Sequence, residues 1–192
     1  MALNQFSKAL LLIVLVGCSY QPEDPIDYNQ EFQSILTTFD NSSILDLDAD
    51  EYVNNTLFLN FVNKLDSQKI HFLEEDLASF EDSQISRGNI YQNLKTVIDI
   101  FYQRYEESLK KRRELLTNHN FDLNIDESIK LNDRERFFLS SDEKTTYLRK
   151  LVKNEIIIQM LDGKAQNEAL AELKTNYRDR LSSLSKVRDE DK

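Results

Sequence analysis

The chain has 192 residues, a formal net charge of −10 at pH 7 and a single cysteine. This length predicts one main domain that is large enough to bury a sizeable hydrophobic core, and the single cysteine excludes a framework of internal disulfides. The acidity argues against partners that are themselves strongly anionic, namely nucleic acids and the headgroups of anionic lipids.

The first 17 residues have the pattern of a signal peptide. Lys8 precedes an unbroken apolar run over 9–16, which is too short to cross a bilayer because a spanning helix needs about 20 apolar residues. The run leads into Leu15-Val16-Gly17-Cys18, which resembles the bacterial lipobox, where a small residue precedes the acylated cysteine. We therefore predict a signal peptide over 1–17 and a lipid on Cys18 that attaches the protein to the membrane. An ordinary signal peptide that contains a cysteine is the alternative.

Residues 18–30 are polar and contain both prolines of the chain, Pro22 and Pro25. This composition predicts a tether between the membrane and the folded domain. Ser19 follows the cysteine directly, which is similar to enterobacterial lipoproteins that are sorted to the outer membrane. The predicted location is therefore the bacterial cell envelope, with the protein anchored by lipid to the outer membrane and facing the periplasm.

The spacing of apolar residues predicts an all-α bundle of about five to six helices over residues 31–186, followed by a charged, frayed tail over 187–192. No proline follows Pro25 and only Gly88 and Gly163 interrupt the pattern, whereas a β fold would need more turn residues. The expected helices are 31–40, a segment that opens at Asp48, 74–81, 89–118, one after Ser140 and one after Gly163.

Local signals support the boundaries of the later helices. Ser140 and Glu143 form a capping box at one helix start, and Asp162-Gly163 is typical of a helix end with glycine just beyond it. The apolar run Ile156–Ile158 is compatible with a strand, but the helical period around it favours a helix. Between 120 and 140 no clean period is present, so a short extended stretch and an ordered loop both remain open.

Few residues qualify as chemical sites. His71 and His119 are expected to be packed or helix-terminal side chains, because nothing in the sequence supplies the nucleophile and orienting group of a catalytic triad. Asp46, Asp48 and Asp50 alternate as in the first half of a calcium loop, but the rest of that motif is missing, so an acidic turn is favoured. No glycine-rich phosphate loop is present. We predict no catalytic residues, no metal site and no cofactor.

The main basic feature is the run Lys110, Lys111, Arg112 and Arg113, within the longest predicted helix. One interpretation is a docking patch for an acidic partner. The other is a solvated helix face near a C-terminus, where positive charges are favoured by the helix dipole.

An ordered set of motifs runs from about residue 50 to residue 186. It comprises LDSQKIHFL at 65–73, Asp76 and Phe80, IDIF at 98–101 before the basic run, FDLNIDES at 121–128, VKNE at 152–155, LDGK at 161–164 and LKTNYRDRL at 173–181. This set resembles the N-terminal helical domain of tail-specific proteases, the carboxy-terminal-processing peptidases of the bacterial periplasm. The family tends to have proline where Ser67 stands, an aromatic residue where His71 stands, and Pro-Trp near Phe137–Phe138.

The resemblance implies a role without catalysis by this chain alone. In the family this domain precedes a PDZ domain and a peptidase core with a Ser–Lys dyad, and no serine or lysine here matches that catalytic motif. The implied function is a lipid-anchored, non-catalytic scaffold that helps to form the protease's substrate-receiving bowl, here expected as a truncated or split form. A free-standing lipoprotein module that binds a periplasmic protease, an adaptor or a protein substrate is the alternative, and an enzyme of unknown type is the third hypothesis. Nucleic acid is not an expected partner.

Overall fold

The computed structural model of the chain describes residues 27–42, 56–81, 85–118, 121–131 and 134–190. These residues form six α-helices and no strand ladder, so the predicted all-α fold with about five to six helices is confirmed. The helices are α2 (Tyr28–Ser42), α4 (Phe58–Leu65), α5 (Glu74–Glu81), α6 (Ile90–Asn118), α7 (Ser141–Leu161) and α8 (Gln166–Glu190). Cys18, His119 and the acidic stretch of Asp46, Asp48 and Asp50 lie outside the described residues, and the inferences made on them stay predictions.

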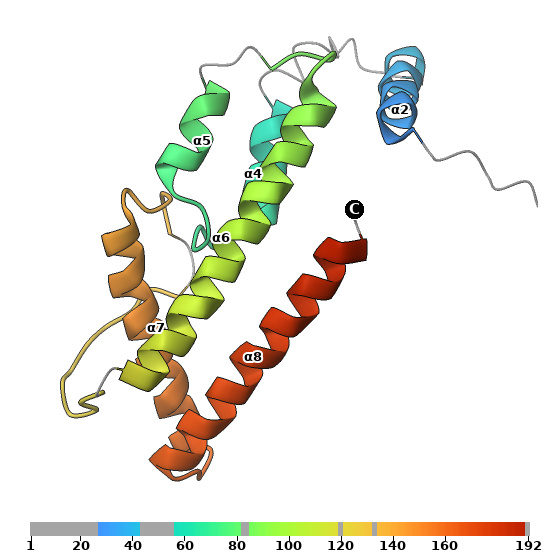
Figure 1. Cartoon of the computed structure of the whole chain (residues 1–192). Coiled ribbons are helices and arrows are strands. Elements are labelled where there is room, and N and C mark those ends of the chain that lie inside the picture. The colour runs from blue at the N-terminus through green and yellow to red at the C-terminus, as the bar shows by residue number, and fades with distance from the viewer. Residues whose placement is uncertain (1–26, 43–55, 82–84, 119–120, 132–133, 191–192) are drawn as a thin grey trace, which may run out of the picture.

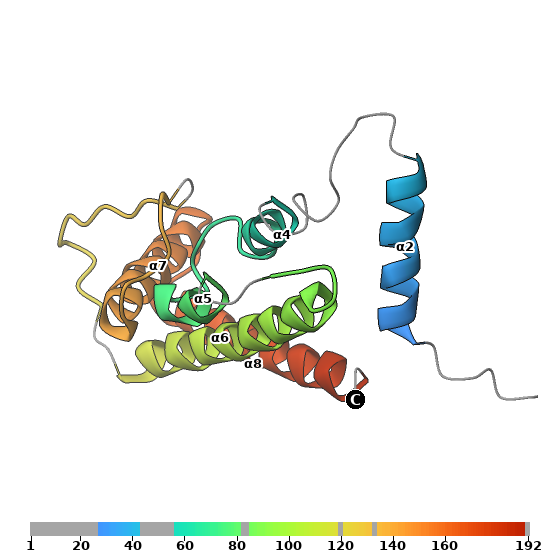
Figure 2. The ribbon, with the colours of Figure 1, turned by 90° about the horizontal axis from the view of Figure 1, so that it is seen from above.

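The long helix α6 is the central element of the bundle (Figure 1). Helices α7 and α8 pack against it and against each other, and α8 runs antiparallel to it (Figure 1). Helix α4 packs on the N-terminal half of α6, and the view from above shows α2 beyond that end of the bundle (Figure 2). The contact with α2 is local: Phe32 lies against Tyr91, with ring centroids 6.0 Å apart, and the Gln33 amide donates to the Arg87 carbonyl at 2.8 Å.

Most predicted helix boundaries agree with the structure to within a few residues. Helix α5 occupies the predicted range 74–81, and α6 begins one residue after the predicted 89. The Ser140 hydroxyl accepts the backbone N–H of Glu143 at 3.2 Å, as a capping residue does. Gly163 has φ of 94°, the left-handed conformation that ends a helix and that glycine adopts without strain. The run Ile156–Ile158 lies within α7.

Two helices are longer than predicted. Helix α2 begins at Tyr28, within the predicted tether, because the Asp27 carboxylate accepts the backbone N–H groups of Asn29 and Gln30 at 3.0 and 3.1 Å and so caps the helix. Helix α8 continues to Glu190, so it extends into the charged tail that was predicted over 187–192. No glycine or proline follows Gly163, and the sequence therefore contains no residue that breaks this helix.

The core consists of neighbouring apolar clusters along α6. One surrounds the N-terminal half of α6 and includes Leu36, Phe58, Val62, Phe72, Phe80, Ile90 and Val97. A second fills the space between α6, α7 and α8 and includes Leu109, Leu116, Phe121, Val152, Ile156, Ala169, Leu173 and Tyr177. A smaller third cluster joins Leu73 and Phe138 to Tyr147 and Leu148 of α7. Apolar side chains thus pack between the helices along the described length of the bundle.

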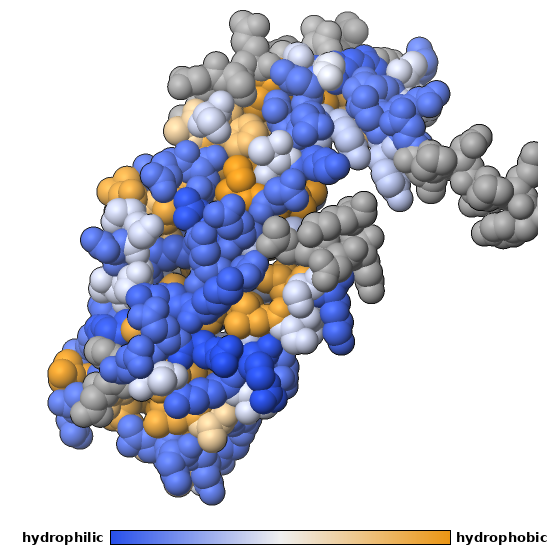
Figure 3. Space-filling view, viewed as in Figure 1, coloured by the Kyte–Doolittle hydropathy of each residue, from blue (hydrophilic) through white to orange (hydrophobic). Residues whose placement is uncertain are grey.

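Of the two alternatives for residues 120–140, the described part is an ordered loop. It contains one isolated bridge, between Leu73 and Phe138, and the backbone N–H of Glu74 donates to the Phe138 carbonyl at 2.9 Å. The loop is therefore tied to the segment that leads into α5. The surface in the view of Figure 3 is largely hydrophilic, with apolar side chains gathered along the junction of α6 and α8. None of the described helices is both long and apolar enough to cross a membrane.

Candidate interaction surface

A buried carboxylate organises the loop between α4 and α5. Asp66 is only 2% exposed, and its two carboxylate oxygens accept the backbone N–H groups of Ile70, His71 and Phe72 at 3.0, 2.8 and 3.0 Å. Lys69 has a left-handed φ of 54° in the turn that brings these N–H groups back to Asp66. Three charge-assisted hydrogen bonds satisfy the buried carboxylate and fix the loop.

His71 is packed like an aromatic residue of this loop. Its ring meets Phe101 and Tyr105 of α6 edge-on, with centroids 5.2 and 5.0 Å away, and its buried Nδ1 has no hydrogen-bond partner. Burial lowers the pKa of His71 to about 4. The negative charge of Asp66 opposes this shift, and the positive charges of Arg112 and Lys144 add to it. The imidazole is therefore neutral at pH 7 and serves packing.

Two cations link this loop to the helices around it. The ammonium of Lys144, on α7, donates to the His71 carbonyl, and its pKa is lowered to about 8, mainly by burial. Arg104, on α6, binds Asp76 in a bidentate manner through Nε and Nη2, at distances of 2.7 to 3.1 Å. The other role of Asp76 is to accept the backbone N–H of Leu73 at 2.8 Å. Helices α5, α6 and α7 thus converge on the 66–76 segment.

The four residues of the basic run do not form one surface. Lys110 pairs with Glu106 at 2.6 Å and Lys111 with Glu114 at 3.0 Å, both along the surface of α6, and Arg113 is exposed. Arg112 is 5% exposed, because successive helical residues point about 100° apart and this one faces the bundle. The predicted four-residue patch therefore needs correction: Arg112 is a core residue, while a docking role for the other three stays a prediction.

Arg112 has its partners inside the bundle. Its guanidinium lies 3.7 Å from the Glu155 carboxylate of α7 and 5.9 Å from the centre of the Tyr177 ring of α8. The Tyr177 hydroxyl donates to Glu155, and burial together with the Glu155 charge raises the pKa of Tyr177. Arg112, Glu155 and Tyr177 thus link α6, α7 and α8 by an ion pair, a cation–π contact and a hydrogen bond. They lie in the region where the apolar side chains of the three helices pack.

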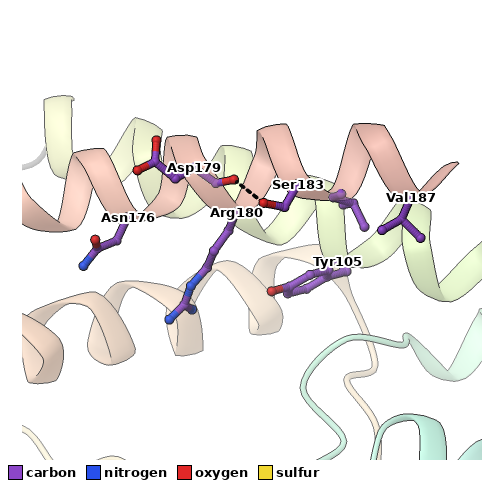
Figure 4. A pocket seen from close by; sticks show the side chains of 7 residues that line it. Tyr105, Asn176, Asp179, Arg180, Ser183 and Val187 are labelled. Carbon is purple, nitrogen blue, oxygen red and sulfur yellow. Dashed lines mark hydrogen bonds between the residues drawn. The ribbon is translucent and has the colours of Figure 1, made fainter. Parts of the chain in front are cut away.

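Several recesses open on the surface of the described residues. The first, of about 600 Å³, lies between α6 and the C-terminal half of α8 (Figure 4). Arg180 of α8 and Tyr105 of α6 lie on one side of α8 there, and the Ser183 hydroxyl is bonded back to the Asp179 carbonyl at 3.0 Å. Leu184 and Val187 also line this recess, so its wall mixes apolar and charged groups.

The second recess is a groove of about 550 Å³ between α4, α5 and residues 135–137. Phe58, Leu59, Val62, Leu77 and Phe137 form its apolar lining. Charged residues of both signs stand among them, so the groove favours neither an acidic nor a basic ligand by charge alone.

The third recess, of about 360 Å³, is lined by residues 128–130, by Arg134 and Phe138, and by the first half of α7, and we call it the cationic notch. Lys130, Arg134 and Lys150 line it together with a single carboxylate, Glu143. The partly exposed Ile129 supplies apolar surface, whereas Phe138 and Tyr147 are buried, with exposed fractions of 0% and 8%. The three cations are spread over 20 positions of the sequence, so no local charge run marked them; only the fold brings them together.

The sequence analysis assigned no role to several residues that hold the 66–76 segment in place. Asp66 stands in the motif at 65–73, but its buried hydrogen bonds depend on a left-handed turn that apolar spacing does not reveal. In the helical pattern, Arg104 falls on the polar face of α6 and Lys144 in the first turn of α7, and neither position indicates a partner in another element. Among the described residues, no group of three His, Cys, Asp or Glu side chains is placed to hold a metal ion.

The family model described as the tail specific protease N-terminal domain matches residues 35–192, which is most of the chain. No curated protein matches this sequence.

Proposed function

The chain belongs to the family of tail-specific protease N-terminal domains, and on this premise we propose that it is a lipid-anchored scaffold that works with the PDZ and peptidase domains of a tail-specific serine protease. The domain itself is non-catalytic. Its task is to form part of the wall that receives the protein substrate, with Cys18 holding it at the membrane. The protease domains act in the same assembly, either on the same polypeptide or on a separate one.

The observation that carries this proposal is the family match over residues 35–192. The segment that resembles the family's signature, 65–73, is held from three sides: by Asp66 from within, by Lys144 from α7 and, through Asp76, by Arg104 from α6. A scaffold needs such fixed geometry, because a receiving wall contributes to binding only when it is ordered beforehand.

The scaffold role is tested with purified components. The full chain is added to the PDZ and peptidase part of a tail-specific protease, and cleavage of an unfolded protein substrate is followed by gel electrophoresis. We expect the chain alone to cleave nothing and the mixture to cleave faster than the protease part alone. If the chain leaves the cleavage rate unchanged and is itself cleaved like any unfolded substrate, the proposal is wrong.

The lipid anchor has its own test. Cys18→Ser should leave the precursor unprocessed or release a soluble periplasmic form, because the modified cysteine is lost. Intact-protein mass and membrane fractionation measure the change, and Ser19→Ala is the matched control that should still carry lipid. Identical mass and fractionation for wild type and Cys18→Ser would contradict anchoring at this residue.

A second candidate function is a free-standing lipoprotein module that binds a protease, an adaptor or a substrate. The surface recesses favour it, because each is a ready surface for a protein ligand. The two functions differ in one measurement: a free-standing module binds its partner but does not change the cleavage rate of the protease part.

A further inference from the structure

We propose that the cationic notch binds an acidic segment of a partner protein, in which aspartate or glutamate side chains flank an apolar residue. This inference deepens the proposed scaffold role by naming the chemistry of a partner, and it rests on that role for its biological setting. The notch residues Lys130, Arg134 and Lys150 bind the carboxylates, while the partly exposed Ile129, which also lines the notch, contacts the apolar side chain.

The charge of the notch is opposite to that of the protein as a whole. The chain carries a formal charge of −10, yet three cations line this recess and only one carboxylate, Glu143, faces them. The field inside a recess is focused by its low-dielectric walls, so a local excess of positive charge attracts anions in spite of the acidic surroundings. An acidic peptide segment is the matching ligand.

The single carboxylate of the notch is already engaged. Glu143 accepts the backbone N–H of Leu139 at 2.8 Å, and the guanidinium groups of Arg136 and Arg134 lie 3.2 and 3.6 Å away. Partial burial opposes ionisation, but the Leu139 N–H and Arg136 lower the pKa of Glu143 below its usual range. Glu143 therefore stays ionised and is shared between two arginines and a helix cap, and no other carboxylate of the described residues lines the notch beside the two lysines.

Among the described residues, neither lysine is paired with a carboxylate. Lys150 donates to the Ser128 carbonyl at 3.3 Å, and Lys130 is exposed, with its own carbonyl accepting the Tyr147 hydroxyl at 3.3 Å. A carboxylate adds the attraction of an opposite charge to the hydrogen bond, so an incoming acidic side chain binds these ammonium groups more strongly than a neutral carbonyl does.

Arg134 is held in place before any ligand arrives. Its guanidinium lies 3.9 Å from the centre of the Phe138 ring and 5.2 Å from that of Tyr147, and its side chain is 16% exposed. Stacking on aromatic rings fixes the plane of an arginine and weakens its hydration. Its buried Nε has no hydrogen-bond partner, which leaves a donor unsatisfied in the described chain. A preorganised arginine of this kind is suited to a carboxylate.

The neighbouring cations on α7 already have a carboxylate partner. Arg149 and Lys153 both bind Glu127, whose pKa falls to about 2 chiefly through its hydrogen bond with Arg149. Their charges are compensated within the protein. Binding of an acidic segment should therefore depend on the notch residues and not on these two neighbouring cations.

The test uses the full chain and a fluorescein-labelled peptide in which glutamates flank a Phe-Leu pair, followed by fluorescence anisotropy. The same peptide with glutamines in place of glutamates is the ligand control. Arg134→Gln and the double variant Lys130→Gln with Lys150→Gln remove notch charges, and Lys110→Gln removes a surface charge that is paired with Glu106 at 2.6 Å. Circular dichroism checks that each variant is folded.

We expect the glutamate peptide to bind and the glutamine peptide to bind at least about tenfold more weakly, a difference of roughly 1.4 kcal/mol. Each notch variant should weaken binding by a similar factor, Lys110→Gln should not, and added salt should weaken binding of the wild type by screening. The proposal is overturned if both peptides bind equally, or if Lys110→Gln weakens binding as much as the notch variants do.

Vesicles that contain phosphatidylglycerol provide the competing arm. A loss of vesicle binding in the notch variants, with unchanged peptide binding, would assign the notch to anionic lipid and overturn the proposal. The peptide assay contains no protease domains. A lack of peptide binding would therefore not contradict the proposed scaffold role, and a lack of association with the protease would not contradict peptide binding by the notch.

Discussion

Lys144 on α7 donates a hydrogen bond to the backbone carbonyl of His71, on the loop between α4 and α5. These residues are far apart in the sequence, and the contact ties the C-terminal half of the bundle to the segment that resembles the family signature. The other side of that loop is fixed by Asp66.

Asp66→Asn should destabilise the protein by about 2–3 kcal/mol. The amide keeps one acceptor oxygen but loses the charge that strengthens three hydrogen bonds, and its NH₂ group faces backbone donors in a buried place. Urea unfolding followed by circular dichroism measures the loss. Ser67→Ala, at the adjacent exposed position, is the control and should change the free energy of unfolding by less than about 0.5 kcal/mol. Equal effects of the two variants would show that Asp66 does not organise the loop.

The stability of the protein should fall as the pH drops from 6.5 toward 4, in part through His71. Burial lowers the pKa of His71 from 6.5 to about 4 in the folded state, so within this window the unfolded chain takes up the proton first and unfolding is favoured. The contribution of the neutral His71 to the free energy of unfolding is fully present above pH 6.5 and amounts to at most about 3 kcal/mol.

His71→Phe should flatten this pH dependence, because an aromatic ring fills the same place between Phe101 and Tyr105 without a titrating group. Urea unfolding at several pH values between 4.5 and 7 measures the slope. His119→Gln is the control, since His119 is the other histidine of the sequence, and it should keep the wild-type slope. If His71→Phe also keeps that slope, His71 does not carry the effect.

The sequence predicted the helices better than it predicted the role of individual charges. The period of apolar residues in α6, the capping residue Ser140 and the stop at Gly163 are local signals, and the structure has the elements that they indicate. The burial of Arg112 and the meeting of Lys130, Arg134 and Lys150 depend on how α7 and the 128–138 segment pack, which no local pattern encodes. The Asp27 cap was missed because nearby prolines suggested a tether.

Arg112→Ala should cost about 3 kcal/mol of stability, whereas Lys110→Ala should cost less than about 0.5 kcal/mol. The first substitution removes a buried cation and leaves Glu155 and Tyr177 without their positive partner between α6, α7 and α8. The second removes an exposed ion pair along one helix. Thermal and urea unfolding compare the two. Similar losses would mean that the basic run acts as one surface after all.

Gly163→Ala should destabilise the junction of α7 and α8 by about 1 kcal/mol, because φ of 94° is unfavourable for a residue with a Cβ atom although the space around it is open. Gly88→Ala is the matched control: Gly88 lacks this conformation, and the nearest atom to an added Cβ is the Ser86 hydroxyl oxygen at 4.0 Å. The free energy of unfolding of the Gly88→Ala variant should equal that of the wild type or be slightly higher. A larger loss at Gly88 than at Gly163 would contradict this view of the turn.

The central claim is that this helical domain is a scaffold for a tail-specific protease, and its most direct test is association between the two. Sedimentation velocity of the purified full chain mixed with the PDZ and peptidase part of such a protease measures the complex without relying on activity. We predict a faster-sedimenting species of defined stoichiometry that is weakened in Asp66→Asn and unaffected in Ser67→Ala. Two independently sedimenting proteins at every concentration would contradict the account.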